Sequence, residues 1–254
     1  MKNDLFSIGG FTIHGYGLMI GMGFLSAYLL SDHRARKKGL DPDHVFGLAI
    51  WVIMIGLVSA KLLYYITTID DILRDPSLLL DIANGFVVYG GIIGGILGGY
   101  GYCRKYKLNF LRYADLILPA VALAQGFGRI GCFLAGCCYG METTGPLAVV
   151  FRDSAYAPNG VRLLPTQLLS SGLNFLHFFL LLWLSQKTKR DGQVAATYLI
   201  LYSAGRFGME FFRGDLIRGT VGSLTTSQFI SLFAAAAGIV MLAVSMKGSE
   251  TADK

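Results

Sequence analysis

Long apolar runs separated by short polar segments dominate this chain. Windows of roughly 17 to 22 apolar residues are long enough to cross about 30 Å of hydrocarbon as helices. The pattern therefore predicts an all-α integral membrane bundle of seven transmembrane helices, which places the two chain ends on opposite sides of the membrane. These windows lie near residues 15–31, 45–66, 85–102, 114–134, 167–184, 194–212 and 227–246.

The composition supports a single membrane domain over residues 1–254. Hydrophobic residues make up 54% of the chain and charged residues only 15%, with a mean hydropathy of +0.54. Soluble domains carry about 25% charged residues, so the composition excludes both an ordinary soluble domain and a disordered chain.

Basic residues gather in alternate connections and indicate the orientation. By the positive-inside rule, the sides richer in Lys and Arg are cytoplasmic, which puts the N-terminus outside and the C-terminus in the cytoplasm. The longer outer loops are then expected near residues 67–84, 140–165 and 213–226. This topology accounts for the net charge of +6, so no nucleic-acid partner is expected. The basic residues are Arg34, Arg36, Lys37 and Lys38; Arg104, Lys105, Lys107 and Arg112; Lys187, Lys189 and Arg190; and Lys247 and Lys254.

The third apolar window is rich in glycine. Gly90, Gly94 and Gly98 recur at intervals of four, and a neighbouring stripe repeats at 91, 95 and 99. Such stripes let partner helices approach the backbone closely. A phosphate-binding glycine loop is the weaker interpretation, because no strand precedes the run and no Lys-Ser or Lys-Thr pair follows it.

Three basic residues fall inside predicted crossings, namely Lys61, Arg129 and Arg206. Insertion of a charged residue at mid-depth costs about 2.5 to 3.5 kcal/mol. We therefore expect these side chains to face a polar cavity, although Lys61 lies near a helix end from which it can extend to the interface.

Arg206 belongs to a polar stripe. Tyr202, Arg206, Glu210 and Arg213 occur at i, i+4, i+8 and i+11, so one helix would present all four on one face. An Arg206–Glu210 ion pair that only neutralises buried charge is the alternative to a binding site.

Arg129 shares a helix face with Gln125 and Cys132 and has no acidic residue within one turn. A guanidinium without a local carboxylate is suited to an anion from outside the helix, and phosphate is the usual match for its fork of donors.

Cys132, Cys137 and Cys138 lie within seven residues. The C-x4-C-C spacing is not a standard zinc motif and no His lies nearby, so helix packing is the simplest interpretation. A redox or soft-metal role is the alternative.

The string GRIGCFLAGCCYG resembles the signature of the bacterial prolipoprotein diacylglyceryl transferase family. Four further motifs of that family follow the same order along nearly the whole chain. They are HGYGLM at 14–19, YGGIIGG at 89–95, PTQL at 165–168 and YSAGRFGMEFFRGD at 202–215.

The resemblance implies a multi-pass enzyme of the bacterial inner membrane. Such an enzyme moves the sn-1,2-diacylglyceryl group of phosphatidylglycerol to the thiol of the lipobox Cys in a prolipoprotein signal peptide, and releases glycerol phosphate. No metal or cofactor is expected. The resemblance implies catalytic roles for Arg129, Arg206 and Tyr89. It implies phosphatidylglycerol binding by Tyr16, Arg129, Tyr202, Arg206, Glu210 and Gly140.

The chain also departs from the family pattern. Tyr89 stands where His is common, Cys132 where Asn is usual and Cys137 where Glu is common. Hydrogen bonding around the phosphate is therefore expected to be thinner than usual. A divergent enzyme and a family member whose thiol proton goes to water or to Tyr89 are two interpretations of these departures. A paralogue acting on another thiol acceptor, a non-catalytic protein that conducts anions and a redox protein using the cysteines all stay open.

Overall fold

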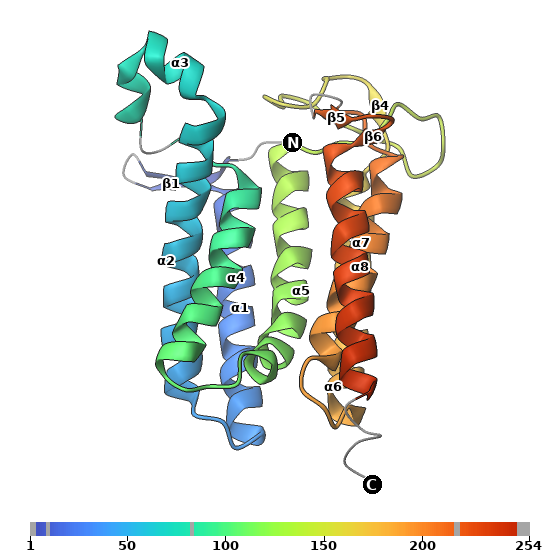
Figure 1. Ribbon diagram of the computed structural model, residues 1–254. Helices are drawn as coiled ribbons and strands as arrows, with labels where there is room; N and C mark the ends of the chain where they lie inside the picture. The colour runs from blue at the N-terminus through green and yellow to red at the C-terminus, as the bar shows by residue number, and fades with distance from the viewer. Residues whose placement is uncertain (1–3, 9–10, 82–83, 216–218, 248–254) are drawn as a thin grey trace, which may run out of the picture. The chain divides into compact units, whose positions relative to one another are not determined.

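A computed structural model describes residues 4–8, 11–81, 84–215 and 219–247. The chain divides into two compact units (Figure 1), which are described separately. Asp32–Tyr113 forms one, called the glycine-helix unit below. Met1–Ser31 with Ala114–Lys254 forms the other, called the arginine unit.

Each expected apolar window corresponds to a long helix. The helices are α1 (Gly15–Lys37), α2 (Pro42–Thr67), α4 (Val88–Lys105), α5 (Phe110–Ala135), α6 (Thr166–Lys187), α7 (Gln193–Glu210) and α8 (Thr226–Lys247).

The predicted end of the first window is wrong. Helix α1 continues to Lys37, so Arg34, Arg36 and Lys37 form its last turn and not a loop. Basic side chains are stabilised there by the partial negative charge at the helix C-terminus. Lys254, counted above with the cytoplasmic residues, lies outside the described residues.

Four helices of the described chain, α2, α5, α6 and α8, are long and apolar enough to cross a membrane. Their hydrophobic surface is largely exposed: in α2, for example, Met54, Leu57 and Leu62 are each more than half exposed. A helix that is apolar on its outer faces is suited to a lipid environment. Glycine and tyrosine residues interrupt the apolar runs of α1 and α4 and lower their mean hydropathy.

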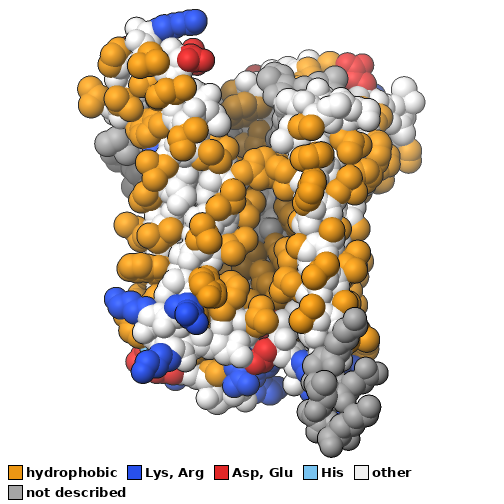
Figure 2. Space-filling model, in the orientation of Figure 1, with side chains coloured by type: hydrophobic (Ala, Val, Ile, Leu, Met, Phe, Trp, Pro, Cys, Tyr) orange, Lys and Arg blue, Asp and Glu red, His pale blue; other side chains and the backbone are white. Residues whose placement is uncertain are grey.

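The glycine stripe of α4 is a packing surface, as expected. A Cβ on Gly90 would lie 2.5 Å from the Ser59 carbonyl oxygen, and one on Gly98 would lie 3.0 Å from Ile55 Cβ. The second stripe also faces α2, because a Cβ on Gly91 would lie 3.6 Å from Ala60 Cβ. Helices α2 and α4 thus run side by side (Figure 1), with hydrophobic side chains along their visible faces (Figure 2).

One end of this unit holds Lys61. Its ammonium donates hydrogen bonds to the carbonyls of Asp81 and Asn84 and lies over the rings of Tyr64 and Tyr65. Lys61 therefore anchors the connection after α2. That connection, expected as a loop near 67–84, contains α3 (Ile69–Arg74) and the 3-10 helix η1 (Pro76–Leu79).

The arginine unit packs α6 and α7 on α5. Its core contains Ala122 of α5, Phe178 and Leu181 of α6, and Val194 and Tyr198 of α7. A polar contact also connects two of these helices. Ser171 donates a hydrogen bond to the Gly126 carbonyl at 2.9 Å, which ties α6 to α5.

The start of α7 is held by a buried carboxylate. Asp115 of α5 accepts hydrogen bonds from the backbone N–H groups of Gly192 and Ala195, both at 2.7 Å. These N–H groups have no partner within the helix, so Asp115 satisfies them from a neighbouring element.

Among the described residues, three short antiparallel strand pairs lie outside the helices, and the hydropathy pattern predicts none of them. They are β1 (Asp4–Ile8) with β2 (Phe11–His14), β3 (Val149–Val150) with β4 (Arg162–Leu163), and β5 (Thr220–Val221) with β6 (Leu224–Thr225). The connection expected near 140–165 has a small core of its own, formed by Phe151, Ala157 and Leu163. In the loop expected at 213–226, residues 216–218 lie outside the described residues.

Candidate active site

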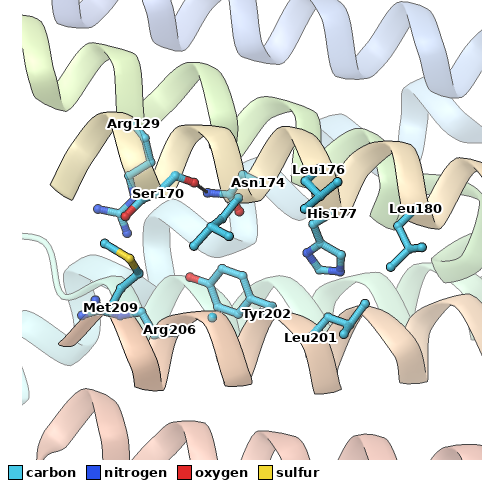
Figure 3. Close-up of a pocket in the computed structure, with 12 residues that line it drawn as sticks. Arg129, Ser170, Asn174, Leu176, His177, Leu180, Leu201, Tyr202, Arg206 and Met209 are labelled. Carbon is cyan, nitrogen blue, oxygen red and sulfur yellow. Dashed lines mark hydrogen bonds between the residues drawn. The ribbon is translucent and has the colours of Figure 1, made fainter. Parts of the chain in front are cut away.

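Helices α5, α6 and α7 of the arginine unit line a cavity of about 280 Å³. In Figure 3, Arg129 and Arg206 lie at one end of this cavity, whereas His177 and Leu180 lie toward the other. The cavity therefore has a cationic end and a more apolar end. Its lining consists of Arg129, Ser170, Leu173, Asn174, Leu176, His177, Leu180, Leu201, Tyr202, Gly205, Arg206 and Met209.

Arg206 is held by two groups on two helices. One guanidinium nitrogen pairs with Glu210 Oε2 at 2.8 Å, and another donates a hydrogen bond to Ser227 Oγ of α8, also at 2.8 Å. The side chains of Arg206 and Glu210 are only 14% and 5% exposed. The ion pair that was the alternative to a binding site is thus present, and it fixes a largely buried guanidinium at the cavity wall.

Arg129 differs from Arg206 in its surroundings. Within the described part of the chain, no carboxylate pairs with it and no hydrogen bond to its guanidinium is found. Because it lines the same cavity as Arg206, two guanidinium groups face one space, and among the described residues a carboxylate pairs only with that of Arg206. This end of the cavity therefore carries an excess of positive charge suited to an anion.

The four-residue helical stripe predicted for α7 is wrong at its last member. The helix ends at Glu210, and Arg213 lies beyond it in a bidentate pair with Asp215, with Arg213 Nε 2.8 Å from Oδ1. Burial lowers the pKa of Arg213, but Asp215 and Cys138 together, through hydrogen bonds and charge, outweigh burial and raise that pKa above its ordinary value. Arg213 therefore has its own carboxylate and does not share Glu210.

Gly140 lies in a backbone bridge. Its N–H donates to the Leu164 carbonyl at 3.0 Å, and it pairs in antiparallel fashion with Arg213. A Cβ at this position would lie 2.5 Å from the Leu164 oxygen. A glycine is thus needed for the close approach of three segments. Its role in lipid binding stays a prediction.

The three tyrosines assigned to the site have different positions. Tyr202 lines the cavity and stacks on Tyr198, with ring centroids 5.6 Å apart. Tyr16, near the start of α1, lies close enough to Arg129 and the cysteines to interact with them electrostatically. Tyr89 is the second residue of α4 and belongs to the glycine-helix unit. Its catalytic role stays a prediction.

Helix α6 supplies site residues that the sequence analysis did not assign. Asn174 and His177 both line the cavity, and the His177 ring stacks on Tyr198 at 5.1 Å. The Nε2 atom of His177 is buried and has no hydrogen-bond partner among the described residues. A polar stripe signals this face, because Gln167, Ser171 and Asn174 recur at helical spacing within an apolar run.

The three clustered cysteines meet at the end of α5. Their sulfur atoms all lie within 4.8 Å of one another, and each residue is partly buried. Hydrogen bonds from Cys132 and Cys137, together with the charge of Arg213, lower the pKa of the Cys138 thiol. The three sulfur atoms therefore form one cluster at the C-terminal end of α5, the helix that carries Arg129.

The family model described as prolipoprotein diacylglyceryl transferase matches residues 3–244 of the chain. The chain belongs to the prolipoprotein diacylglyceryl transferase family. The match extends over both units and includes six of the long helices in full and α8 up to residue 244.

Individual relatives agree with this family. The phosphatidylglycerol–prolipoprotein diacylglyceryl transferase of Clostridium tetani is 51% identical over 239 residues, which cover 94% of this chain and 96% of the relative. Transferase 2 of Clostridium perfringens is 46% identical over the full length of both chains. Transferase 1 of the same organism is 32% identical and covers 96% of this chain and 94% of its own length. Membership of this transferase family and the four long apolar helices make the protein a multi-pass membrane enzyme.

Proposed function

We propose that the protein transfers the diacylglyceryl group of phosphatidylglycerol to the lipobox cysteine thiol of prolipoproteins and releases glycerol phosphate. The observation that carries this proposal is the pair of arginines in one cavity, one buried against Glu210 and one that has no carboxylate partner among the described residues. The names of the relatives identify the same lipid and protein substrates for those enzymes.

The reaction needs a site that stabilises a departing phosphate. The thiol sulfur attacks the glyceryl carbon bonded to the phosphate ester oxygen, the carbon–oxygen bond breaks, and negative charge grows on the phosphate. Two preorganised guanidinium groups stabilise that charge most when water is largely excluded from them. Arg129 is the group free to bind the phosphate directly, while Glu210 and Ser227 hold Arg206 in position.

The apolar part of the cavity fits the rest of the lipid. Leu173, Leu176 and Leu180 of α6 line the cavity, and Leu176 and Leu180 lie away from the arginine end (Figure 3). A phospholipid has the same polarity, with a charged head group followed by apolar chains. The proposed pose therefore places the phosphate at the arginines and the acyl chains along α6.

The proposed topology has seven crossings, one for each long helix, with the N-terminus outside and the C-terminus in the cytoplasm of a bacterial inner membrane. The basic turns at the ends of α1 and α4 support it. In the glycine-helix unit the start of α2 lies beside the end of α4, with the His44 and Tyr106 rings 5.2 Å apart. The two basic clusters therefore share one end of that unit, as the positive-inside rule requires.

The test is thioether formation in vitro. The purified full-length protein is supplied with phosphatidylglycerol and a lipobox peptide, and the lipidated peptide is measured by mass spectrometry. We expect Arg129→Ala to lower the rate by about 100- to 1000-fold, the usual effect of removing one donor to a developing oxyanion. The control is Arg36→Ala, which removes an exposed arginine paired with Asp32 in the other unit.

An unchanged rate for Arg129→Ala would contradict the assignment of the site. A wild-type protein that never labels the peptide, but moves glycerol phosphate across liposome membranes, would instead support the anion-conducting alternative. Growth of cells depleted of their own transferase tests the same reaction in vivo, and lipidated lipoproteins are the expected result.

A further inference from the structure

The backbone at the C-terminal end of α5 brings two cysteines close together. Helix α5 closes with paired hydrogen bonds from Cys137 N–H to the Cys132 carbonyl at 3.1 Å and from Gly136 N–H to the Phe133 carbonyl at 3.2 Å. Gly136 has a φ of 78°. This is a Schellman motif, in which the residue after the glycine lies over the residue five positions earlier. The helix cap therefore sets Cys137 against Cys132.

The third cysteine is held in place by α6. Cys138 has a φ of 60°, a conformation that costs a non-glycine residue about 1 to 3 kcal/mol unless its surroundings enforce it. Thr166 donates a hydrogen bond to the Cys138 carbonyl at 3.0 Å, and Gln167 donates one to the Cys137 carbonyl at 2.8 Å. Both donors are almost completely buried. The loop that carries the sulfurs is thus fixed to a packed helix.

The cluster has the composition of a soft-metal site. Three sulfurs within 4.8 Å of one another need to contract by no more than about 1 Å to reach the roughly 3.8 Å separation that a tetrahedral zinc ion with Zn–S bonds near 2.3 Å requires. A disulfide would use two of the sulfurs and leave the third without a role. Three protein ligands and an open fourth position are typical of catalytic zinc, whereas structural zinc has four protein ligands.

The position of the cluster relates it to the proposed reaction. Cys132 follows Arg129 by three residues on α5, so the two side chains project from neighbouring turns of the same helix. Arg213 lies against Cys138. A sulfur bound at the cluster would therefore lie next to the end of the cavity where the phosphate is proposed to bind.

We infer that Cys132, Cys137 and Cys138 bind one zinc ion through three thiolates, and that the fourth position of the zinc takes the cysteine thiol of the acceptor peptide. This inference rests on the proposed function for its acceptor, but the metal site itself does not. The cysteine spacing favoured packing and left a redox or soft-metal role as the alternative; the zinc ion, its three ligands and the acceptor thiol go beyond that.

The chemistry is an alkylation of sulfur and involves no oxidation. When the peptide thiol coordinates zinc it loses its proton to solvent, because a coordinated thiol is deprotonated. The sulfur lone pair then forms the bond to the glyceryl carbon while the carbon–oxygen bond breaks, and the departing glycerol phosphate keeps that electron pair. The thioether product carries no charge and is a weaker zinc ligand, so it leaves the metal.

The first experiment measures zinc in the full-length protein. The protein is purified in detergent under reducing conditions with zinc present, dialysed, and analysed for metal by mass spectrometry. We expect about one zinc per chain in the wild type and in Cys103→Ser, which changes a buried cysteine of the other unit. The triple variant Cys132→Ser, Cys137→Ser, Cys138→Ser is expected to retain less than about a tenth of that zinc.

Zinc absent from the wild type, equal zinc in the triple variant, or a disulfide within the cluster of the reduced protein would each overturn the metal site. Elution as a single species in gel filtration checks that the triple variant is folded. If it is not, Cys138→Ala takes its place, since it removes a sulfur beyond the end of α5. We expect its zinc affinity to fall at least tenfold, and an unchanged affinity would equally overturn the site.

The second experiment tests the fourth ligand with cobalt(II) in place of zinc. Adding a lipobox peptide should raise the sulfur-to-cobalt charge-transfer absorbance by roughly a third, since the thiolates increase from three to four. The same peptide with Ser in place of Cys should have no effect. Equal responses to both peptides, or no response, would overturn thiol coordination.

Neither the zinc content nor the cobalt absorbance depends on turnover. The zinc site and the proposed phosphate site can therefore be contradicted separately. Arg129→Ala should retain both the metal and the peptide response while losing transfer. If Arg129→Ala instead transfers lipid normally, the proposed phosphate site is wrong and the zinc measurements still stand.

Discussion

Glu210 pairs with Arg206 one helical turn away, with 2.8 Å between Oε2 and Nη1, and both side chains are largely buried. Arg129 lines the same cavity and has no such carboxylate among the described residues. The site therefore combines one neutralised and one uncompensated guanidinium. The first is suited to hold geometry and the second to attract a phosphate.

Removing the Glu210 charge should destabilise the protein. In Glu210→Gln the Arg206 guanidinium keeps its burial but loses its counter-ion, which costs about 3 kcal/mol for a buried pair. Reversible unfolding in mixed micelles measures this loss. The matched control is Asp32→Asn, which breaks the Arg36–Asp32 pair, where Arg36 is 65% exposed; the expected loss there is less than about 1 kcal/mol. Equal losses in the two variants would contradict a buried role for Glu210.

Replacing Arg206 by Lys should show whether catalysis needs only the positive charge of this side chain or also its planar guanidinium. Lysine can still pair with Glu210, so we expect little change in thermal stability. Lysine lacks the planar guanidinium, so it cannot bind Glu210, Ser227 and a phosphate at the same time. We therefore expect kcat to fall at least about tenfold. Steady-state kinetics with phosphatidylglycerol give the answer. Undiminished turnover would show that Arg206 only completes an ion pair.

Tyr89→Phe distinguishes two routes for the thiol proton. If zinc has already made the thiolate, the phenol is not needed as a base, and we expect the rate to fall by less than about tenfold. The lipobox assay measures this at several pH values. A loss as large as that of Arg129→Ala would make Tyr89 the base and would argue against activation of the thiol by metal.

The packing of α2 on α4 predicts opposite effects for two glycines of one helix. Gly90→Ala forces a Cβ to within 2.5 Å of the Ser59 carbonyl oxygen and should destabilise the protein. Gly101→Ala meets no atom within 4 Å and should stabilise it by about 0.5 to 1 kcal/mol, because alanine loses less conformational entropy in a helix. Melting temperatures in detergent compare the two. A stabilised Gly90→Ala would contradict close packing at that stripe.

The sequence by itself determined the helices and much of the chemistry of the site. Apolar runs predict the seven long helices, with the C-terminal end of α1 as the largest error, because a segment that crosses lipid satisfies its backbone hydrogen bonds as a helix. Charges inside those runs single out Arg129 and Arg206 because each is costly in hydrocarbon and needs a polar cavity. The spacing of four likewise predicts the Arg206–Glu210 pair, which is local to one helix.

Only the tertiary structure decided which distant groups share a space. Ser227, Asn174 and His177 join the arginines through the packing of α6, α7 and α8, and no periodicity within one helix reports a neighbour on another. Because α7 ends at Glu210, Arg213 lies outside the predicted stripe and pairs with Asp215. The cysteines became a three-sulfur cluster because a helix cap folds the chain back and α6 holds the turn. Their spacing alone carries no such information, since the distance between side chains depends on the path of the backbone between them.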